Sequence, residues 1–261
     1  MGRGGEVSRR AAVGLSVGAA GFAVVGAAAG RGLDDYQRTH RPPSYRVAPL
    51  TETSTHGREA RLVWRGPAVG RGVALTFDDG PDPRWTPKVL ERLAKHHVHA
   101  TFFMLGRSVE RYPDVARQVA EAGHEIGIHG WTHKDMTTIG LPDLTKIMKR
   151  THAQISEATG RSPVLLRPPY GRFDAEVIYA ATGFGYTIPL WSHSLPSKNS
   201  LSAATHNVEV ASPGMIVLAH DARARASQDV VVAADWMIDR MQTSGYTFQT
   251  VTAMLDAGDR G

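Results

Sequence analysis

From Gly72 onward, short apolar runs alternate with longer segments in which apolar residues recur every three or four positions. The short runs predict strands, and they read GVALTF, ATFFMLG, HEIGIHG, VLLRPPYG, YTIPLW, GMIVLAHD and YTFQTV. The longer segments predict helices, and they read TPKVLERLAKHHV, PDVARQVAEAG, LPDLTKIMKRTHAQISEATG, DAEVIYAATGFG and DVVVAADWMIDRMQTSG. Strands that alternate with helices build a parallel sheet, and about seven such units favour a barrel over an open sheet. We therefore predict an α/β fold, a (β/α) barrel with about seven parallel strands.

Residues 1–30 have a different pattern. Arg3, Arg9 and Arg10 precede an uncharged stretch from Ala11 to Gly30 that is rich in Ala, Gly and Val. A basic start, an apolar core and small residues at its end are typical of an export signal, and SRRAAV resembles the twin-arginine type. The alternative is an uncleaved membrane anchor, because about 20 apolar residues span a bilayer. The high Gly and Ala content favours cleavage, and both interpretations predict an extracellular or cell-envelope location.

Residues 31–70 are rich in Arg, are interrupted by Pro42, Pro43, Pro49 and Pro67, and have no sustained period. This composition predicts a linker that ends in a short strand at ARLVW and leads into a folded domain at residues 71–256. Residues 1–71 hold 11 Arg, no Lys and 5 acidic residues, so the net charge of +5 arises there and not in the domain. No nucleic-acid partner is expected, because such binding needs a basic face on the folded domain.

Polar and ionisable residues gather where the predicted strands end. They are Asp78 and Asp79 in TFDDGP, His129 and His133 in HGWTHKD, Arg167 and Tyr170 in RPPYG, and His220 and Asp221 in LAHD. In a (β/α) barrel the functional residues lie at the carboxyl ends of the strands, so we expect these side chains to meet there. A plain turn is the alternative for TFDDGP, since Asp, Gly and Pro commonly reverse the chain after a strand.

The pair His129 and His133 is the candidate metal-binding motif. The chain contains no Cys, so a metal must be held by His, Asp or Glu. Two imidazoles four residues apart can converge on one ion from a helical turn, and a carboxylate from the Asp78–Asp79 pair would complete three ligands. The fourth position then stays open for water, as a catalytic zinc site requires.

Taken in order, TFDDGP, HGWTH, RPPYG and LAHD resemble the motifs of the polysaccharide deacetylase family, the NodB-like domains of carbohydrate esterase family 4. The resemblance extends from about Val73 to Val251, and it makes residues 71–256 a polysaccharide deacetylase catalytic domain. It implies a distorted (β/α) barrel with about seven strands and a divalent metal, usually Zn²⁺, with Co²⁺ as an alternative.

The resemblance makes Asp78 the general base and Asp79, His129 and His133 the metal ligands. Physical reasoning agrees with this division, because a carboxylate bound to a metal loses much of its basicity whereas a free neighbour can take a proton from water. Arg167 resembles the residue that holds the base and keeps it ionised. Taken alone, Arg167 is equally well explained as a surface ion pair.

The resemblance also implies residues that act on the substrate. The backbone N–H of Tyr170 would stabilise the oxyanion, and His220 would protonate the leaving sugar amine. Leu218 would line the acetyl pocket, and Pro168 and Trp191 match further substrate-binding positions. Taken alone, His220 is equally well explained as a strand-end histidine bonded to backbone.

One segment departs from the family pattern. The family usually carries an Asp-Trp pair shortly after the Trp of "LW", and the Asp orients the acid histidine and raises its pKa. Here the sequence reads LWSHSLPSKNS, without either residue. His193, Ser194 and Ser197 are the candidates to replace the Asp beside His220.

The leading hypothesis is an exported, metal-dependent hydrolase that removes N-acetyl groups from cell-wall or chitin-type polymers of N-acetylglucosamine, with peptidoglycan or chitooligosaccharides as substrate. An esterase that acts on O-acetylated xylan is a close alternative, because the same chemistry would serve. A second class is a non-catalytic member that binds glycan, suggested by the altered LWSHSLPSKNS segment. A third is an unrelated barrel with a structural metal, which leaves Asp78 without a task.

Three other residues are predicted to be structural. Asp174 precedes a helical pattern and is expected to cap it. His124 precedes a strand and is expected to be peripheral. Trp131 lies between the metal-candidate histidines, where it could either stack on a sugar or pack within the domain.

Overall fold

The computed structural model describes residues 61–258 of the 261-residue chain. The predicted export signal or anchor and residues 31–60 of the predicted linker lie outside the described residues. Among residues 61–258, no helix combines the length and apolar character needed to cross a membrane. The predicted short strand at ARLVW is present as β1 (Arg61–Val63), and it pairs with β5 (Thr187–Pro189), so residues before Gly72 contribute to the folded body.

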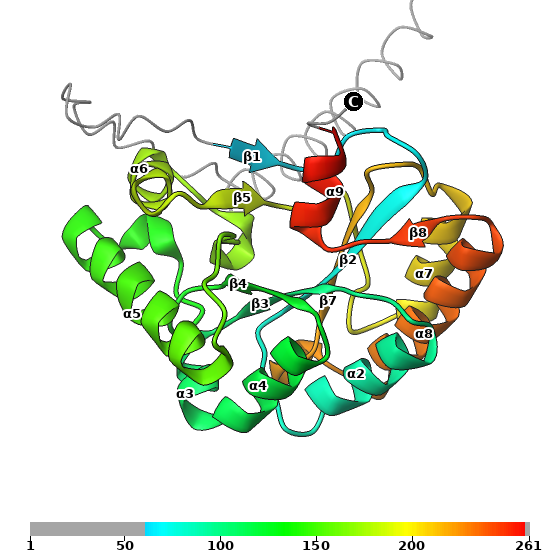
Figure 1. Cartoon of the computed structure of the whole chain (residues 1–261), viewed down its shortest axis with the longest axis horizontal. Helices are drawn as coiled ribbons and strands as arrows, with labels where there is room; N and C mark the ends of the chain where they lie inside the picture. The colour runs from blue at the N-terminus through cyan, green and yellow to red at the C-terminus, as the bar shows by residue number, and fades with distance from the viewer. Residues whose placement is uncertain (1–60, 259–261) are drawn as a thin grey trace, which may run out of the picture. The chain divides into compact units, whose positions relative to one another are not determined.

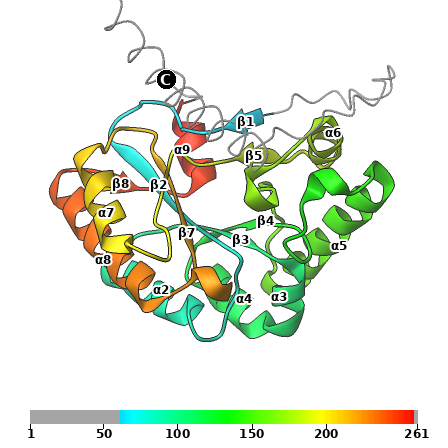
Figure 2. The same cartoon turned by 180° about the vertical axis from the view of Figure 1, so that it is seen from behind.

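The described residues contain eight strands, and every ladder between them is parallel. Besides β1 and β5, the strands are β2 (Gly72–Asp78), β3 (Thr101–Met104), β4 (Glu125–Ile128), β6 (His193–Ser194), β7 (Ile216–His220) and β8 (Thr247–Phe248). One sheet has the order β4-β3-β2-β7-β6 with β8 on β2, and β1 pairs with β5 in a second. Figures 1 and 2 show the strands at the centre and the helices around them. The predicted α/β fold with parallel strands is therefore confirmed.

Two contacts between the sheets bring the strands close to a ring. Isolated bridges join Ile128 to Leu166 and Leu165 to Thr187, so the segment 165–166 links β4 to β5. On the other side, Gly66 N donates to Gly214 O over 2.7 Å, which connects the segment after β1 to the residues before β7. The array is thus a distorted barrel, in which short ladders and isolated hydrogen bonds replace the continuous strand pairing of a regular barrel.

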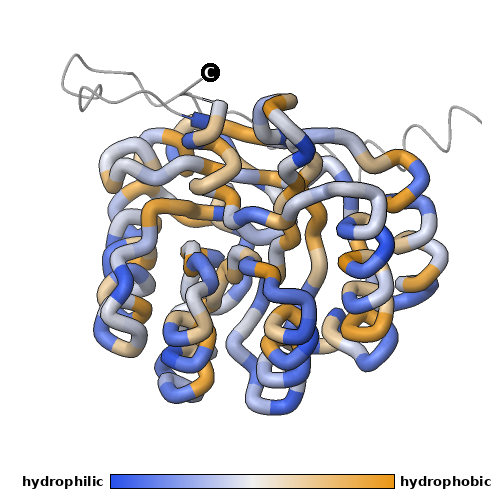
Figure 3. Tube along the Cα trace, turned by 45° about the vertical axis from the view of Figure 1, so that its right-hand side comes forward, coloured by the Kyte–Doolittle hydropathy of each residue, from blue (hydrophilic) through white to orange (hydrophobic). Residues whose placement is uncertain are grey.

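The helices lie around this array, and the last of them lies at the end where the strands begin. They are α2 (Thr86–Lys95), α3 (Gly106–Arg111), α4 (Pro113–Glu121), α5 (Leu141–Thr159), α6 (Ala175–Phe184), α7 (Ser200–Glu209), α8 (Gln228–Thr243) and α9 (Val251–Gly258), with 3₁₀ turns η2 (Met136–Thr138), η3 (Pro169–Gly171) and η4 (Arg223–Arg225). Figure 3 shows hydrophilic residues interspersed with hydrophobic ones along these helices, as amphipathic helices require. Asp174 caps α6 as predicted, because its side chain accepts a hydrogen bond from Val177 N.

Three helices and one strand differ from the sequence pattern. The sequence pattern did not predict α3, α7 or α9. α3 is only six residues long, which is too short for a helical period to be recognised. α7 buries only Ser200, Ala204 and Asn207, so its pattern of apolar residues is weak. The predicted strand in VLLRPPYG is reduced to the two bridges at 165–166. The reason is that Pro168 and Pro169 lack the N–H that a longer ladder needs.

His124 is not peripheral, which corrects the expectation from sequence. It is buried, and its Nδ1 accepts a hydrogen bond from Ala100 N over 3.2 Å. Burial and the neighbouring His99 lower the pKa of His124 to about 4. The imidazole, which lies between α4 and β4, therefore serves as a neutral acceptor for the backbone N–H of Ala100, the residue directly before β3.

The alternation of side chains along β2 divides the core into two parts. Val73, Leu75 and Phe77 belong to the larger apolar cluster together with residues of the helices. Ala74 belongs to a second cluster with Phe103, Leu165, Ile216 and three residues of α9. Because successive side chains of a strand point to opposite faces, Thr76 and Asp78 share the inward face with Ala74. The strand thus directs Asp78 to the inside of the barrel.

α9 closes the end of the barrel where the strands begin. Val251 N donates to Thr101 Oγ1 over 3.0 Å, and Thr252 N lies 3.3 Å from Glu125 Oε2. Thr101 and Glu125 are the first residues of β3 and β4. The opposite end, where the strands finish, is therefore the end at which a site can form.

We expect Gly214→Ala to destabilise the fold through the contact that joins the ring. Gly214 has a φ of +78°, and a Cβ there would overlap the carbonyl of Gly66. Gly160→Ala is the matched control, because Gly160 has a φ of +66° and open space around the Cβ position. In both variants the positive φ of the new alanine should lower the free energy of unfolding by about 1 kcal/mol. In Gly214→Ala alone, the steric overlap should lower it by a further amount of about 1–3 kcal/mol. Urea unfolding of the full-length chain measures the difference, and equal losses would show that the 66–214 contact is loose.

Candidate metal centre and active site

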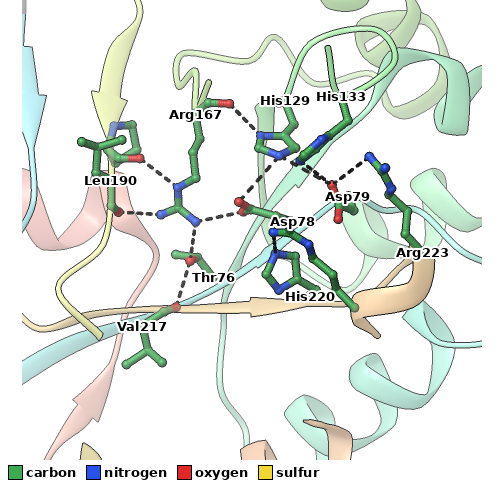
Figure 4. A network of polar contacts seen from close by, with 12 residues as sticks. Thr76, Asp78, Asp79, His129, His133, Arg167, Leu190, Val217, His220 and Arg223 are labelled. Atoms are coloured by element: carbon green, nitrogen blue, oxygen red, sulfur yellow. Dashed lines mark hydrogen bonds and ion pairs between the residues drawn. The ribbon is translucent and has the colours of Figure 1, made fainter. Parts of the chain in front are cut away.

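The predicted site residues meet at the end of the barrel where the strands finish. Asp78 and His220 are the last residues of β2 and β7, and they are partners in the ladder between those strands. His129 directly follows β4, and His129 N donates to Met104 O over 2.9 Å at the end of β3. Figure 4 shows these side chains converging with Asp79 and His133. Residues up to 142 positions apart thus share one site, as the barrel rule predicted.

Asp79, His133 and His129 form a compact cluster. Asp79 Oδ1 lies 3.3 Å from His133 Nε2 and 3.6 Å from His129 Nε2. One ligand atom from each residue lies within 4.8 Å of the others, and all three residues are buried. Both carboxylate oxygens of Asp79 are buried without a hydrogen-bond partner among the described residues. A carboxylate in that position is costly unless a cation faces it, so these three residues fit a metal.

The backbone turns sharply to bring Asp79 and His133 into this cluster. Asp79 has a φ of 78° and His133 a φ of 59°, in the left-handed region that few residues other than Gly, Asn, Asp and His adopt. The change of direction at Asp79 lets its side chain join the histidines while Asp78 stays in the strand. The HGWTH segment is a loop and not the helical turn that the H-x-x-x-H spacing suggested.

Burial keeps both imidazoles neutral and leaves their Nε2 atoms directed at the cluster. Burial is the largest cause that lowers the pKa of His129 and of His133 to about 3. His129 Nδ1 donates to the backbone carbonyl of Arg167 over 2.7 Å, which leaves Nε2 without a proton. Asp79 behaves oppositely, since burial and then the charge of Asp78 raise the pKa of Asp79 to about 7. The donor set is two neutral imidazoles and one carboxylate, which is typical of catalytic zinc.

Asp78 is held by the buried guanidinium of Arg167. Arg167 Nη1 donates to Asp78 Oδ1 over 2.9 Å and to Thr76 Oγ1 over 2.7 Å, and its Nε and Nη2 donate to the carbonyls of Pro189 and Leu190. Arg167 is 0% exposed, so it is not a surface ion pair. The second oxygen of Asp78, Oδ2, lies 3.8 Å from His129 Nε2 and faces the cluster. Asp78 is therefore fixed next to the cluster without belonging to it.

His220 has no carboxylate partner among the described residues. It is buried, its Nδ1 has no hydrogen-bond partner there, and its Nε2 lies 3.5 Å from Arg225 Nη1. His193, Ser194 and Ser197 therefore do not bond to His220 Nδ1, and His193 Nδ1 instead lies 3.0 Å from Ser192 Oγ. Burial lowers the pKa of His220 to about 4, and the charge of Asp78 opposes that shift.

The predicted substrate-binding residues surround the same mouth. Leu218 is buried two residues before His220 on β7, so it shares the inward face with that histidine. Pro168 is buried, and Tyr170 is 48% exposed with its ring centroid 4.5 Å from that of His133. Trp191 is half-buried, and a Cβ on Gly171 would lie 2.8 Å from its ring, so it packs beside the RPPYG segment.

The ring of Trp131 is half-buried and packs against other residues of the protein. The guanidinium of Arg150 lies 3.5 Å from its ring centroid, and a Cβ on Gly106 would lie within 2.7 Å of its six-membered ring. These contacts favour packing over sugar stacking, the two alternatives that the sequence left open.

Three further residues border the site, and the sequence pattern did not predict a role for them. Asp221 is buried, accepts a hydrogen bond from Thr86 Oγ1, and lies beneath Gly80, since a Cβ there would lie 2.6 Å from its oxygens. Burial raises the pKa of Asp221 to about 7. Arg223 Nη1 lies 3.8 Å from Asp79 Oδ1, and Arg225 faces His220. The run DARAR directly after a strand end was the available signal for both arginines.

Known proteins are similar to this chain in sequence and in fold. Residues 65–189 match the family model described as polysaccharide deacetylase. A peptidoglycan-N-acetylglucosamine deacetylase of Bacillus cereus is 35% identical over 193 residues, which cover 73% of this chain and 70% of that protein. The chain belongs to the polysaccharide deacetylase family. The predicted family and the hydrolase class that it implies are confirmed.

Solved structures of polysaccharide deacetylases have the same fold. The crystal structure of the Bc1960 peptidoglycan N-acetylglucosamine deacetylase, in complex with 4-naphthalen-1-yl-N-oxidanyl-benzamide, has a TM-score of 0.71 and 30% identity, and covers 76% of this chain and 94% of its own. BA3943 of Bacillus anthracis, described as a pseudoenzyme of carbohydrate esterase family 4, has a TM-score of 0.69 and 27% identity over 76% of this chain and 70% of its own. The fold alone therefore does not show that a protein is catalytically active, and a conclusion about activity depends on the residues of the site.

We expect Arg167→Met to destabilise the protein strongly. The substitution leaves the Asp78 carboxylate buried without a cation, and breaking a buried pair in this way costs about 3–5 kcal/mol. The double variant Arg167→Met/Asp78→Asn removes the unpaired charge and should recover part of the loss. Urea unfolding of the full-length chain provides the measurement. A double variant that is less stable than Arg167→Met would contradict this account of the pair.

We also expect metal affinity to depend on pH through Asp79. Its pKa of about 7 means that a metal must displace a proton below pH 7, whereas histidines with a pKa of about 3 do not compete there. Zinc affinity should therefore fall about tenfold per pH unit below pH 7 and level off above it. Competition against a chelator between pH 5.5 and 8.5 measures this slope.

Substitutions separate the three ligand candidates from the base candidate. Asp79→Asn, His129→Ala and His133→Ala should each release zinc, and Asp78→Asn should retain it. Circular dichroism checks that each variant is folded. Zinc retention by Asp79→Asn at wild-type affinity would rule this cluster out as the metal centre.

Proposed function

We propose that this polysaccharide deacetylase is an exported, metal-dependent hydrolase that removes acetyl groups from the N-acetylated amino sugars of peptidoglycan. The observation that carries the proposal is the buried Asp79–His129–His133 cluster with a separately held carboxylate, Asp78, beside it. Relatives named peptidoglycan-N-acetylglucosamine and peptidoglycan-N-acetylmuramic acid deacetylases support the substrate class. The leader-like pattern of residues 1–30 supports export, with an uncleaved anchor as the alternative.

We propose Zn²⁺ as the metal, with Co²⁺ as an alternative. Asp79, His129 and His133 would hold the ion, because two imidazoles and a carboxylate form a three-ligand set that leaves one position open. When bound, such an ion supplies a nucleophilic water at neutral pH and polarises the acetyl carbonyl. The protein supplies the remaining steps through Asp78, His220 and the backbone near Tyr170.

Asp78 is the proposed general base. Its Oδ1 is occupied by Arg167, and its Oδ2 faces the cluster, so that oxygen is free to take a proton from the attacking water. The guanidinium also keeps the orientation of the carboxylate constant during the reaction. Leu218 limits the room on the inward face of β7 to a small group such as acetyl, and the Tyr170 N–H is the proposed donor to the oxyanion.

His220 is the proposed acid for the leaving amine. Its position opposite Asp78 in the ladder places both residues on one side of the mouth. Burial favours the neutral imidazole at pH 7, so His220 must gain a proton in the course of the reaction. The Asp78 charge favours that step, whereas Arg225 opposes it.

A glycan-binding role without turnover is the second candidate. It is favoured by one observation, the absence of any partner for His220 Nδ1 among the described residues. An acid histidine normally has a group that orients it and stabilises its charged form. The similarity to the pseudoenzyme BA3943 makes this candidate worth a direct test.

The test is acetate release by the zinc-loaded full-length chain from peptidoglycan, chitooligosaccharides and acetylated xylan. We expect metal-dependent release from peptidoglycan, a loss of about 10²–10⁴-fold in kcat for His220→Ala, and a comparable loss for Asp78→Asn. Asp174→Asn is the matched control, since Asn also caps a helix and Asp174 lies at the start of α6, outside the site.

The outcomes distinguish the candidates. Release from acetylated xylan alone would favour the esterase. Absence of release from every substrate, while zinc is retained and peptidoglycan is bound, would favour the glycan-binding role.

A further inference from the structure

Two arginines lie at the mouth of the site, and neither has been given a role toward the substrate. Arg223 and Arg225 form η4 between β7 and α8, and both are exposed. Ala222 and Ala226 on either side are buried, so they anchor the loop and leave the two long side chains at the surface. Figure 4 shows Arg223 directed at Asp79, and Arg225 Nη1 lies 3.5 Å from His220 Nε2. The loop thus presents two guanidiniums to the residues proposed to do the chemistry.

These guanidiniums lack a permanent anionic partner. Within residues 61–258, Asp79 is the only carboxylate that pairs with Arg223, at 3.8 Å, and Arg225 pairs with none. Asp79 is also a candidate metal ligand, and a divalent ion held there would repel Arg223. Three carboxylates, those of Asp78, Asp79 and Asp221, then stand against the ion and the guanidiniums of Arg167, Arg223 and Arg225. The mouth carries an excess of positive charge, which attracts anions to it.

We propose that Arg223 and Arg225 bind a carboxylate that the substrate carries next to the acetamido group being hydrolysed. In peptidoglycan, the lactyl ether of an N-acetylmuramic acid unit without its peptide places a free carboxylate on the carbon beside the one that bears the acetamido group. A guanidinium binds a carboxylate through two parallel hydrogen bonds, and two arginines on one short loop can share it. The inference rests on the proposed deacetylase function and defines its substrate as an anionic amino sugar.

The same contact would change the surroundings of His220. Arg225 Nη1 faces His220 Nε2, the nitrogen that has to carry a proton to the leaving amine. A positive charge at that distance opposes protonation of the imidazole. A substrate carboxylate gives Arg225 another partner and so removes it from Nε2. Arg225 therefore acts as a positioning residue for the substrate, and its departure favours the acid form of His220.

The experiment compares two substrates that differ in one charge. One is the disaccharide of N-acetylglucosamine and N-acetylmuramic acid with a free lactyl carboxylate, and the other is its lactyl methyl ester. For the zinc-loaded full-length chain, we expect kcat/KM to be about tenfold or more higher for the free acid, as a charge-assisted hydrogen bond predicts. In Arg223→Ala/Arg225→Ala the ratio should fall toward one, and the double Lys variant should keep part of it.

Arg161→Ala is the matched control. Arg161 is exposed in the connection after α5, which leads into the beginning of a strand segment and so lies at the other end of the barrel. This variant should keep the wild-type ratio. Calorimetry of both disaccharides with the zinc-loaded Asp78→Asn chain, with and without the arginine substitutions, gives a second readout that does not depend on turnover. The free acid should bind about tenfold or more tightly only when both arginines are present.

The outcomes separate this inference from the proposed function. Equal kcat/KM for acid and ester in the wild-type chain overturns the arginine site and leaves the deacetylase function intact. A preference for the acid that survives in Arg223→Ala/Arg225→Ala also overturns it. Absence of hydrolysis of either disaccharide and of peptidoglycan counts against the deacetylase function, and calorimetry then decides whether the arginines bind the carboxylate.

Discussion

The buried guanidinium of Arg167 is the interaction on which the mouth of the barrel depends. It bonds Thr76 and Asp78 of β2 and the carbonyl of Leu190 beyond β5, so it ties together strands that no ladder joins directly. The backbone carbonyl of Arg167 accepts a hydrogen bond from His129 Nδ1. A single residue therefore orients the proposed base and sets the tautomer of a proposed metal ligand. The first effect comes from the desolvated guanidinium, which makes four hydrogen bonds to protein atoms, and the second comes from the backbone carbonyl of the same residue.

Around that pair, burial drives the other ionisable groups toward their neutral forms. The pKa values of Asp79 and Asp221 are raised, and those of His129, His133 and His220 are lowered, with desolvation as the largest cause in each case. Such a site is poorly suited to charges of its own but well suited to a divalent cation, which needs neutral imidazoles and an unpaired carboxylate. The arginines of η4 then lie at the border between this desolvated interior and solvent.

Much of this could be predicted from the sequence, because period and motif position are local signals. The apolar runs predict β2 and β7, and the rule that functional residues lie at strand ends predicts that Asp78, His129 and His220 lie together. The residues that were missed depend on tertiary packing. Arg223 lies 3.8 Å from Asp79 in a loop that is anchored on both sides by the buried Ala222 and Ala226. No sequence rule predicts that a loop after a strand turns inward.

The short helices and the histidine beside β4 show the same limit. α7 buries two polar residues, Ser200 and Asn207, so its amphipathic period is weak. The His124 imidazole accepts a hydrogen bond from a backbone N–H that only the folded chain presents.

The division of β2 into an outer face of Val73, Leu75 and Phe77 and an inner face ending at Asp78 has one further consequence. A deletion or insertion of one residue within this strand would exchange the two faces. The number of residues between Gly72 and Asp78 is therefore as strictly constrained as the identity of the aspartate itself.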